Sequence, residues 1–237
     1  MFPSPCPPTG SPVWEVRPPS DLAAPALPGG WRDEPIGFSG QGRTITALVS
    51  PTETPTRRVI VFGGIHGNEP VGPPAARQMV TVDVPDGIEL WLVPDLNPDG
   101  TAAGTRCNAA GVDLNRNFSW RWRASTGGPG PFSEPESSAA RDLVERLLPD
   151  LVVWIHQPLD YVSAIGPTAD VIEQAWSAAS GLPVRPDVSQ HGGGESWAAF
   201  VAGRPSLLVE DAGWDATPEM VASQVAGLQA VLDVLGA

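Results

Sequence analysis

Short apolar runs alternate with helix-like segments along this chain, and this alternation constrains the fold more than any other feature. The four apolar runs occupy residues 59–62, 88–94, 151–156 and 206–210, lengths that suit strands better than helices. Segments with the spacing and end signals of helices lie at residues 70–82, 133–148, 169–180 and 217–236. Strands that alternate with helices predict an α/β sandwich.

Two further segments complete the expected layout. Residues 31–50 contain two apolar stretches around Gly40-Gln41-Gly42, so we expect a β-hairpin there. Residues 1–30 are rich in Pro, Ser and Ala without periodicity, and we expect an irregular leader. Residues 31–237 are enough for a single domain with a full core.

Charge and targeting signals exclude several classes of protein. A formal charge of −13 argues against nucleic acid and anionic membrane surfaces as partners, because both require basic patches. No apolar run is long enough to span a membrane, and the N-terminus lacks the regions of a secretory signal. We therefore expect a cytoplasmic protein. With two cysteines, Cys6 and Cys107, nothing in the sequence requires a disulfide.

Two of the three histidines end apolar runs, which makes them candidate metal ligands. His66 and Glu69 follow the first run, and His156 ends the third. Zinc accepts histidine nitrogen and carboxylate oxygen, and a catalytic zinc keeps three protein ligands. Each motif alone is weak, because a histidine that closes a strand is more often a hydrogen-bonded structural residue. Together they point to a zinc site.

The last apolar run ends in a carboxylate, Glu210. In open α/β sheets, functional residues gather at the carboxyl ends of strands. A zinc hydrolase needs a nearby carboxylate that takes a proton from water and passes it to the leaving amine. Glu210 is therefore the candidate general base, with a fourth ligand or a structural residue as the alternatives.

The segment at residues 95–132 has the composition of a functional loop. Within it, residues 105–118 contain two arginines and three asparagines: Arg106, Asn108, Asn115, Arg116 and Asn117. A guanidinium suits a carboxylate or a developing oxyanion. The alternative is a set of ion pairs with the many acidic residues of the chain.

Local motifs give three expectations about the backbone. Asn97-Pro98-Asp99-Gly100 predicts a turn, because Pro and Gly fix its conformation. Ser133 and Glu136 have the spacing of a capping box at a helix start. Residues 187–200 are rich in glycine, and we expect a mobile loop there.

In their order along the chain, these motifs resemble those of the zinc metallocarboxypeptidase family and, within it, its bacterial murein peptide amidase branch. The resemblance covers roughly residues 36–215. It implies a three-layer α/β/α sandwich with a mixed sheet of about eight strands, and one zinc ion per chain. It also implies a set of roles. His66, Glu69 and His156 would bind zinc, Arg106 would hold the oxyanion, Glu210 would be the general base, and Asn115 and Arg116 would hold the substrate's terminal carboxylate.

Three positions bear on specificity. Larger members of the family have a tyrosine that caps the substrate, whereas the one tyrosine here is Tyr161, shortly after His156. Glu195 lies about where the family sets side-chain selectivity. We hypothesise that it receives an ammonium group, such as the distal amine of diaminopimelate, and a solvated surface glutamate is the alternative. We do not expect nearby His191 to be a ligand.

The first functional hypothesis is a zinc-dependent metallopeptidase or amidase that cuts an amide bond next to a free carboxylate. Its substrate would be a small murein-type peptide with a γ-D-glutamyl–diaminopimelate bond. The alternative is a zinc-dependent N-acyl amino acid deacylase of the succinylglutamate desuccinylase or aspartoacylase type. A third hypothesis is an inactive binding module, against which Glu210 and Arg106 argue, because binding alone needs no general base. The sequence predicts no oligomeric state.

Overall fold

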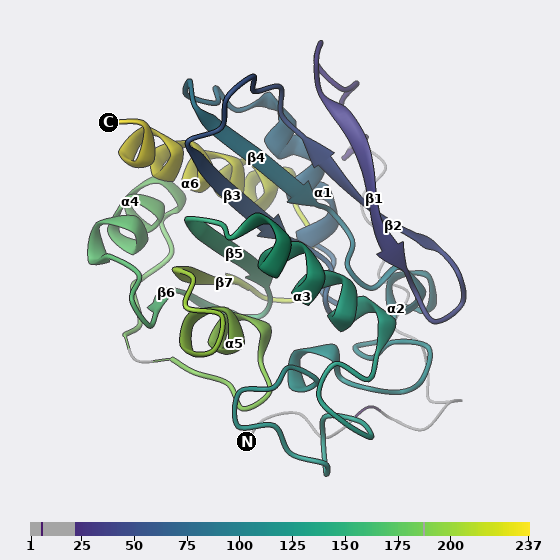
Figure 1. The fold of residues 1–237 in the computed structure, drawn as a ribbon. Coiled ribbons are helices and arrows are strands. Elements are labelled where there is room, and N and C mark those ends of the chain that lie inside the picture. The colour runs from purple at the N-terminus through teal and green to yellow at the C-terminus, as the bar shows by residue number, and fades with distance from the viewer. Residues whose placement is uncertain (1–5, 7–21, 187) are drawn as a thin grey trace.

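A mixed β-sheet lies between two layers of helices in the computed structural model (Figure 1). The structure describes residue 6, residues 22–186 and residues 188–237. The strands are β1 (Arg32–Phe38), β2 (Thr44–Val49), β3 (Arg57–Phe62), β4 (Ile88–Val93), β5 (Leu151–His156), β6 (Leu159–Ile165) and β7 (Ser206–Ala212). The helices are α1 (Gly72–Gln78), α2 (Pro98–Ala103), α3 (Pro135–Leu147), α4 (Asp170–Ser180), α5 (Gly194–Phe200) and α6 (Pro218–Gly236), with short 3₁₀ helices η1 (Met79–Thr81) and η2 (Leu114–Arg116).

The strand order across the sheet is β1-β2-β4-β3-β5-β7-β6. The four central strands, β4, β3, β5 and β7, pair in parallel, while β1, β2 and β6 join by antiparallel pairing. Every residue of β4 and β5 is buried. A strand covered on both faces needs apolar side chains on both, which explains why these segments are continuous apolar runs.

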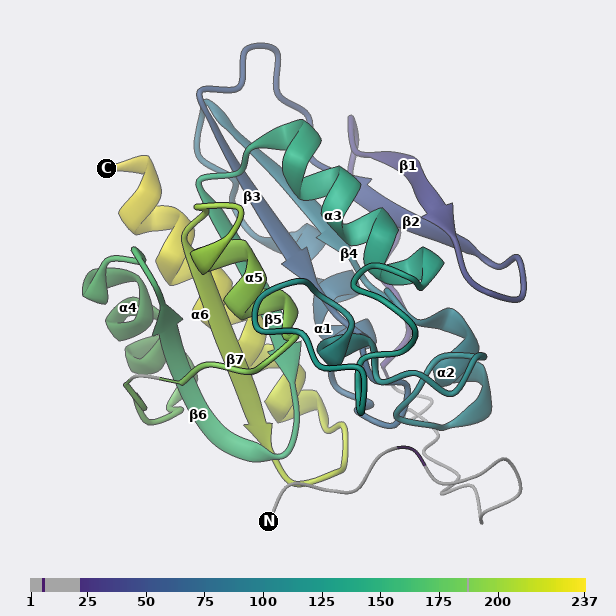
Figure 2. The same cartoon turned by 60° about the horizontal axis from the view of Figure 1, so that its bottom comes forward.

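Helices cover both faces of the sheet, with a separate apolar core on each (Figure 2). On one face α1, α4 and α6 enclose a core that includes Val61 and Trp176. On the other face α3 and α5 cover Phe62, Trp154 and Trp197. Phe62 and Trp154 stack with their ring centroids 4.5 Å apart. Full burial of such a side chain contributes about 2–3 kcal/mol, so both layers fix the strands that end at the candidate site.

The predicted sandwich is confirmed, and so are its hairpin, four strands and four helices, with boundaries that differ by a few residues. α6 begins after Thr217, whose side chain accepts a hydrogen bond from the backbone N–H of Met220 at 3.2 Å. The sheet has seven strands in the described residues rather than about eight. β6 was not predicted, because Asp160 and Ser163 interrupt its apolar pattern.

Three local expectations are wrong. The segment at 97–100 is no simple turn, because the side chain of Asn97 accepts a hydrogen bond from the backbone N–H of Gly100 at 2.9 Å and caps α2. No capping box starts α3, since Glu134 holds the N-cap position and Ser133 donates to its carboxylate instead. The expected mobile loop contains α5, whose first six residues are buried.

The two cysteines are paired, although the sequence requires no disulfide. The Cα atoms of Cys6 and Cys107 are 5.9 Å apart, a usual separation for a disulfide. The bridge joins residue 6 to the loop that carries Arg106. The rest of the predicted leader, at 1–5 and 7–21, lies outside the described residues, and residues 22–30 form neither helix nor strand.

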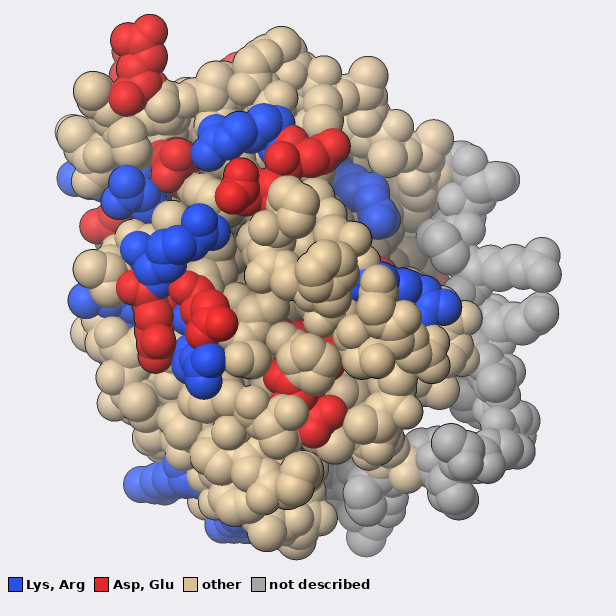
Figure 3. Space-filling view, turned by 45° about the vertical axis from the view of Figure 1, so that its right-hand side comes forward, with Lys and Arg blue, Asp and Glu red and all other residues tan. Residues whose placement is uncertain are grey.

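Surface charge is mixed on the face drawn in Figure 3, where acidic and basic side chains lie close together in small groups. The described residues of that face therefore form no broad basic patch of the kind that nucleic acid requires. None of the helices in the described part of the chain is both long and apolar enough to cross a bilayer.

Candidate active site

Three neighbouring strands deliver the candidate residues to one edge of the sheet. β3, β5 and β7 lie side by side and run parallel. His66 and Glu69 lie in the loop after β3, His156 is the last residue of β5, and Glu210 lies near the end of β7. His156 pairs in register with Glu210. The parallel topology thus brings together residues that are far apart in the sequence.

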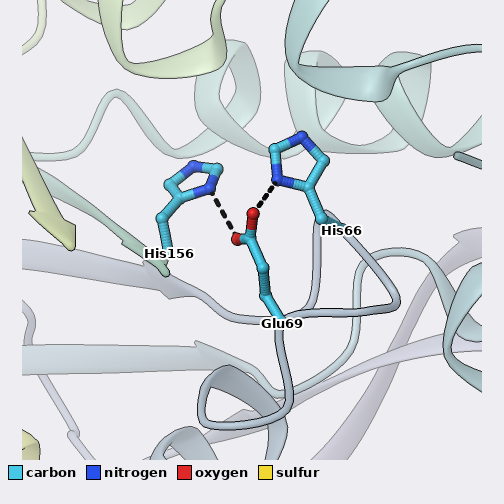
Figure 4. A group of neighbouring side chains, drawn as sticks. All are labelled: His66, Glu69 and His156. Carbon is cyan, nitrogen blue, oxygen red and sulfur yellow. Dashed lines mark hydrogen bonds and ion pairs between the residues drawn. The ribbon is translucent and has the colours of Figure 1, made fainter. Parts of the chain in front are cut away.

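His66, Glu69 and His156 form a buried cluster in which the carboxylate lies between two imidazoles (Figure 4). The Nδ1 atom of His66 is 2.7 Å from Glu69 Oε1, and the Nδ1 atom of His156 is 3.0 Å from Glu69 Oε2. One ligand atom from each residue lies within 4.8 Å of the others. Two imidazole nitrogens and a carboxylate oxygen are a donor set that zinc accepts, so the residues present fit a catalytic zinc.

The charges of this cluster depend on one another. Burial alone would raise the pKa of Glu69, but the adjacent imidazoles of His66 and His156 lower it far below its usual range. Burial and the charge of Arg106 act to lower the pKa of His66, yet Glu69 and Asp113 raise it overall. Glu69 is therefore ionised at neutral pH, as a metal-binding carboxylate must be.

Asp113 was missed by the sequence reasoning and connects two parts of the site. Its Oδ1 atom is 3.0 Å from His66 Nε2, and its Oδ2 atom accepts a hydrogen bond from Arg106 Nε at 2.9 Å. A carboxylate on the second nitrogen of a metal-binding histidine fixes the tautomer and the ring orientation. Asp113 lies two residues before Asn115 in the motif that carried the family resemblance, which was the available signal.

Arg106 lies beside the cluster. Its Nη1 atom is 3.2 Å from Glu69 Oε1, in addition to its bond with Asp113. Burial acts to lower the pKa of this guanidinium, but Asp113 and Glu69 raise it overall. The side chain is thus a fixed cation next to the candidate metal ligands, suited to a developing negative charge.

Glu210 is buried, and its Oε2 atom has no hydrogen-bond partner among the described residues. Burial raises its pKa to about 7, while His156 acts to lower it and Glu69 to raise it further. A carboxyl group whose pKa lies near neutrality can accept a proton and return it in the same reaction cycle.

Asn115 and Arg116 flank the cluster, but Asn115 is partly committed to structure. Its Oδ1 atom accepts a hydrogen bond from the backbone N–H of Gly194 at 2.8 Å, and its Nδ2 atom is 3.5 Å from His156 Nε2. Arg116 donates to the carbonyl of Asn115 at 2.6 Å and stays partly exposed. Its guanidinium therefore has donors left for a ligand.

The other two asparagines of the loop hold it in place. Asn108 donates to Glu134 at 2.8 Å and to Glu136 at 3.1 Å. The amide nitrogen of Asn117 donates to the carbonyl of Gly127 at 2.6 Å. Buried amides with several partners rigidify irregular backbone, so these two residues stabilise the loop and do not face the cluster.

Glu195 is not the solvated surface residue that was the alternative. It is fully buried in α5, where Oε1 accepts a hydrogen bond from Ser196 at 3.2 Å and Oε2 has no partner among the described residues. Tyr161 is buried on β6, paired in register with Glu210. Burial and the nearby carboxylate of Glu210 raise the pKa of Tyr161. His191 lies apart from the metal-ligand cluster, with its ring 5.7 Å from that of Trp120.

A sequence profile described as zinc carboxypeptidase, of peptidase family M14, matches residues 27–164, more than half of the chain. The chain belongs to the zinc carboxypeptidase family. The family is one of hydrolases, so the predicted family and enzyme class are confirmed. The profile does not test the roles of individual residues, which stay predictions.

Relatives of this zinc carboxypeptidase include murein peptide amidase A of Escherichia coli K12, 34% identical over 118 residues that cover 42% of this chain and 49% of that protein. Murein peptide amidase A of Vibrio campbellii is 30% identical over 123 residues, 44% of this chain and 50% of that protein. The chain thus spans about half the length of these curated relatives. The crystal structure of murein-tripeptide amidase from Escherichia coli O157 matches with a TM-score of 0.68 and 25% identity, over 94% of this chain and 97% of that one.

Proposed function

We propose that this protein is a zinc-dependent amidase that cuts an amide bond next to a free carboxylate in a small murein-type peptide. The observation that carries the proposal is the buried His66–Glu69–His156 cluster beside Glu210, whose buried Oε2 atom has no partner among the described residues. A binding module would gain nothing from a buried carboxyl oxygen without a partner at such a place, because its desolvation is costly. In a general base, that free oxygen can accept a proton from water.

The residues would divide the chemistry as follows. His66, Glu69 and His156 would hold one zinc ion, which supplies Lewis acidity when bound. Glu210 takes a proton from the attacking water and delivers it to the leaving amine. Arg106, fixed by Asp113, donates hydrogen bonds to the carbonyl oxygen as negative charge develops there. Arg116, with Asn115 beside it, binds the substrate's free carboxylate.

The substrate assignment is supported by the names of the relatives and by Glu195. Murein peptide amidases and a murein-tripeptide amidase are among the matched proteins, together with metallocarboxypeptidases. Glu195 has a buried oxygen without a partner, and an ammonium group of the substrate would satisfy it. Diaminopimelate has an ammonium group at its distal end. We therefore propose the γ-D-glutamyl–diaminopimelate bond as the bond that is cut.

The deciding experiment is hydrolysis of the tripeptide L-Ala-γ-D-Glu-diaminopimelate, with and without a chelator. We expect free diaminopimelate to be released, the release to stop on chelation, and zinc to restore it. A panel of N-acyl amino acids assayed in parallel tests the competing deacylase function. Release from that panel alone, with one zinc bound per chain, would move the substrate class to acyl amino acids.

The general base is tested by Glu210→Gln. This variant should bind zinc as the parent does and lose at least about 10²-fold in kcat, in line with the contribution of general-base catalysis. Zinc content measured by atomic absorption serves as the control for folding of the site. Turnover equal to the parent's, at full zinc content, would show that Glu210 is not the base.

The role of Glu195 is tested with leaving residues of different charge. Glu195→Gln should reduce the preference for a basic over a neutral leaving residue, because the amide cannot neutralise an ammonium group. The ratio of kcat/KM for the two substrates is the readout. An unchanged ratio would remove Glu195 from the specificity assignment.

A further inference from the structure

Arginines are concentrated on one side of the candidate site. The chain has 14 basic residues in all, and four of them, including Arg121 and Arg123, fall within residues 106–123. No acidic residue occurs in residues 114–133. Arg121 and Arg123 are exposed, and neither forms an ion pair with any residue that the structure describes. A local excess of positive charge on a chain of −13 is unusual and suggests an anionic ligand.

The segment that carries these arginines is firmly attached to the loop before α5. The backbone N–H of Phe118 donates to the carbonyl of Gly192 at 2.9 Å, and the N–H of Gly192 donates to the carbonyl of Trp120 at 2.7 Å. Trp120 also stacks on Phe200 of α5, with ring centroids 5.0 Å apart. In Figures 1 and 2 this part of the chain, between η2 and α3, lies next to α5. The arginines therefore have a rigid base.

A side chain within the segment orients the guanidinium of Arg121. The guanidinium of Arg121 lies over the Trp120 ring, 4.7 Å from its centroid. Arg121 also has φ of 47°, a left-handed conformation that few non-glycine residues adopt. Burial lowers the pKa of His191, and the charges of Arg123, Arg121 and Arg116 lower it further. The ring of His191 also lies 5.7 Å from that of Trp120. We call Arg121, Arg123, Trp120 and His191 the arginine rim.

The arginine rim is continuous with the substrate-binding residues. Arg116 lies five residues before Arg121, and a side chain at Gly192 would collide with the backbone of Arg116. Gln190 lies in the same loop as Gly192. Its backbone N–H donates a hydrogen bond to the hydroxyl of Ser196, and that hydroxyl donates to the carboxylate of Glu195. The loop at residues 190–192 thus links the arginine rim both to Arg116 and, through Ser196, to Glu195.

We propose that Arg121 and Arg123 bind a second carboxylate of the substrate, one that belongs to the leaving residue and lies beyond the carboxylate held by Arg116. The inference rests on the proposed function and deepens it. An amino acid with an ammonium group and a carboxylate at its distal end would place the first near Glu195 and the second near the arginine rim. Diaminopimelate has both groups, and lysine differs from it only by lacking the distal carboxylate.

This difference gives a matched pair of substrates. We would compare hydrolysis of L-Ala-γ-D-Glu-diaminopimelate and L-Ala-γ-D-Glu-L-Lys by the parent and by Arg121→Ala/Arg123→Ala. The parent should prefer the diaminopimelate peptide. The variant should lose about tenfold in kcat/KM for that peptide, mostly through KM, because two charge-assisted hydrogen bonds to an exposed group contribute roughly this much. Its kcat/KM for the lysine peptide should stay within about twofold of the parent's.

Two further variants separate recognition from structure. Arg121→Lys/Arg123→Lys keeps the charge and should restore part of the preference. Arg57→Ala/Arg146→Ala removes two charges near the opposite edge of the sheet, where β3 begins and α3 ends, and should leave the preference unchanged. Higher ionic strength should reduce the parent's preference, since exposed charges are screened. Equal losses for both peptides, or no loss for either, would overturn the proposal.

A binding measurement separates failure of this proposal from failure of the proposed function. If the zinc-loaded parent hydrolyses neither peptide, the amidase function is wrong. Calorimetric titration of the zinc-loaded protein with free diaminopimelate and with free lysine still tests the arginine rim. The parent should bind diaminopimelate more tightly than lysine, and the double alanine variant should bind both with similar affinity. Equal affinities in the parent would contradict the assignment.

Discussion

At the scale of single residues, Asp113 links the candidate metal site to the candidate oxyanion-binding arginine. One carboxylate oxygen contacts a candidate zinc ligand, His66, and the other holds the candidate oxyanion donor, Arg106. Two adjacent functional groups are thus oriented by a third that touches neither substrate nor metal. Such supporting residues affect a site through geometry and through the basicity of the ligand.

Asp113→Asn should therefore weaken zinc binding about 10- to 100-fold, the usual effect of losing a carboxylate behind a metal-binding histidine. Competition with a chromogenic chelator measures the affinity. Glu210→Gln is the matched control, because it removes a carboxylate of the same site that is not proposed to orient a ligand, and its zinc affinity should stay near the parent's. Unchanged affinity in the Asp113 variant would mean that this contact does not orient His66.

At the scale of elements, the loop after β3 depends on how closely α2 approaches it. A Cβ atom at Gly67 would lie 1.9 Å from the carbonyl carbon of Gly100 and 2.2 Å from the backbone nitrogen of Thr101. Both neighbours are backbone atoms at the start of α2, so they cannot rotate away. The close approach fixes the loop that holds His66 and Glu69.

Gly67→Ala should cost more than about 2 kcal/mol in the free energy of unfolding, because a backbone shift is required. Urea denaturation followed by tryptophan fluorescence measures this. Gly130→Ala is the control, since its added Cβ would meet no atom within 4 Å, and it should change stability by less than about 0.5 kcal/mol. Similar stabilities for the two variants would show that the loop and α2 can separate at little cost.

A second element-scale prediction concerns Asp211 at the end of β7. Asp211 is buried, and its Oδ2 atom accepts a hydrogen bond from Gln224 of α6 at 2.6 Å. Burial raises its pKa to about 6 from an ordinary value near 4. A raised carboxyl pKa means that the folded state holds the proton more tightly. The resulting stability is present below about pH 4 and is lost as the pH rises through 6.

Asp211→Asn, which cannot ionise, should consequently be more stable than the parent at pH 8, by about 1 kcal/mol or more. Near pH 4 the two proteins should have similar stability. Urea midpoints at the two pH values measure the difference. The exposed Asp86→Asn should show no such change between the two pH values. If the difference in stability between Asp211→Asn and the parent were the same at both pH values, the pKa of Asp211 would not be raised in the folded protein.

The elements that the sequence predicted well are those with a strong local signal. β3, β5 and β7 contain apolar runs, so the residues at their ends could be named as candidates from position, whereas their roles came from the family resemblance and stay predictions. β6 could not be predicted, because Asp160 and Ser163 interrupt its apolar pattern, and Ser163 becomes buried only where the strand pairs with β7. Glu195 was placed in a loop because its flanking glycines suggested one. It became a buried helical residue because α5 packs on the sheet beside Trp154, a contact between distant segments. Asp113 was passed over because its role depends on His66, far away in the chain.

At the scale of the whole molecule, the disulfide between Cys6 and Cys107 closes a long loop of the chain, with a sequence separation of 101 residues. Such a bridge stabilises mainly by restricting the unfolded chain, by up to about 4–5 kcal/mol for a loop of this size. The predicted cytoplasmic location stands in tension with it, because cytosolic thiols are kept reduced.

Reduction of the oxidised protein should therefore lower Tm by roughly 10 °C, if about 4 kcal/mol is lost from a chain of this length. Differential scanning calorimetry with and without dithiothreitol measures the shift. Cys6→Ser is the control, and its Tm should not respond to the reductant. A Tm of the parent that is also insensitive to reductant, together with two free thiols by titration, would show that the bridge does not form in solution.

The placement of the candidate ligands on β3 and β5 has a consequence for how the chain gains its stability. Glu69 and His156 are 87 residues apart in the sequence and meet only when the middle of the sheet has formed. An ion that binds them will bind the native state and not the unfolded one, so it shifts the folding equilibrium by mass action. Removal of zinc by a chelator should therefore lower the local stability of the central strands more than that of the hairpin at the edge of the sheet. Amide hydrogens of β3, β5 and β7 would exchange faster without zinc, while those of the hairpin β1–β2 would exchange at nearly the same rate.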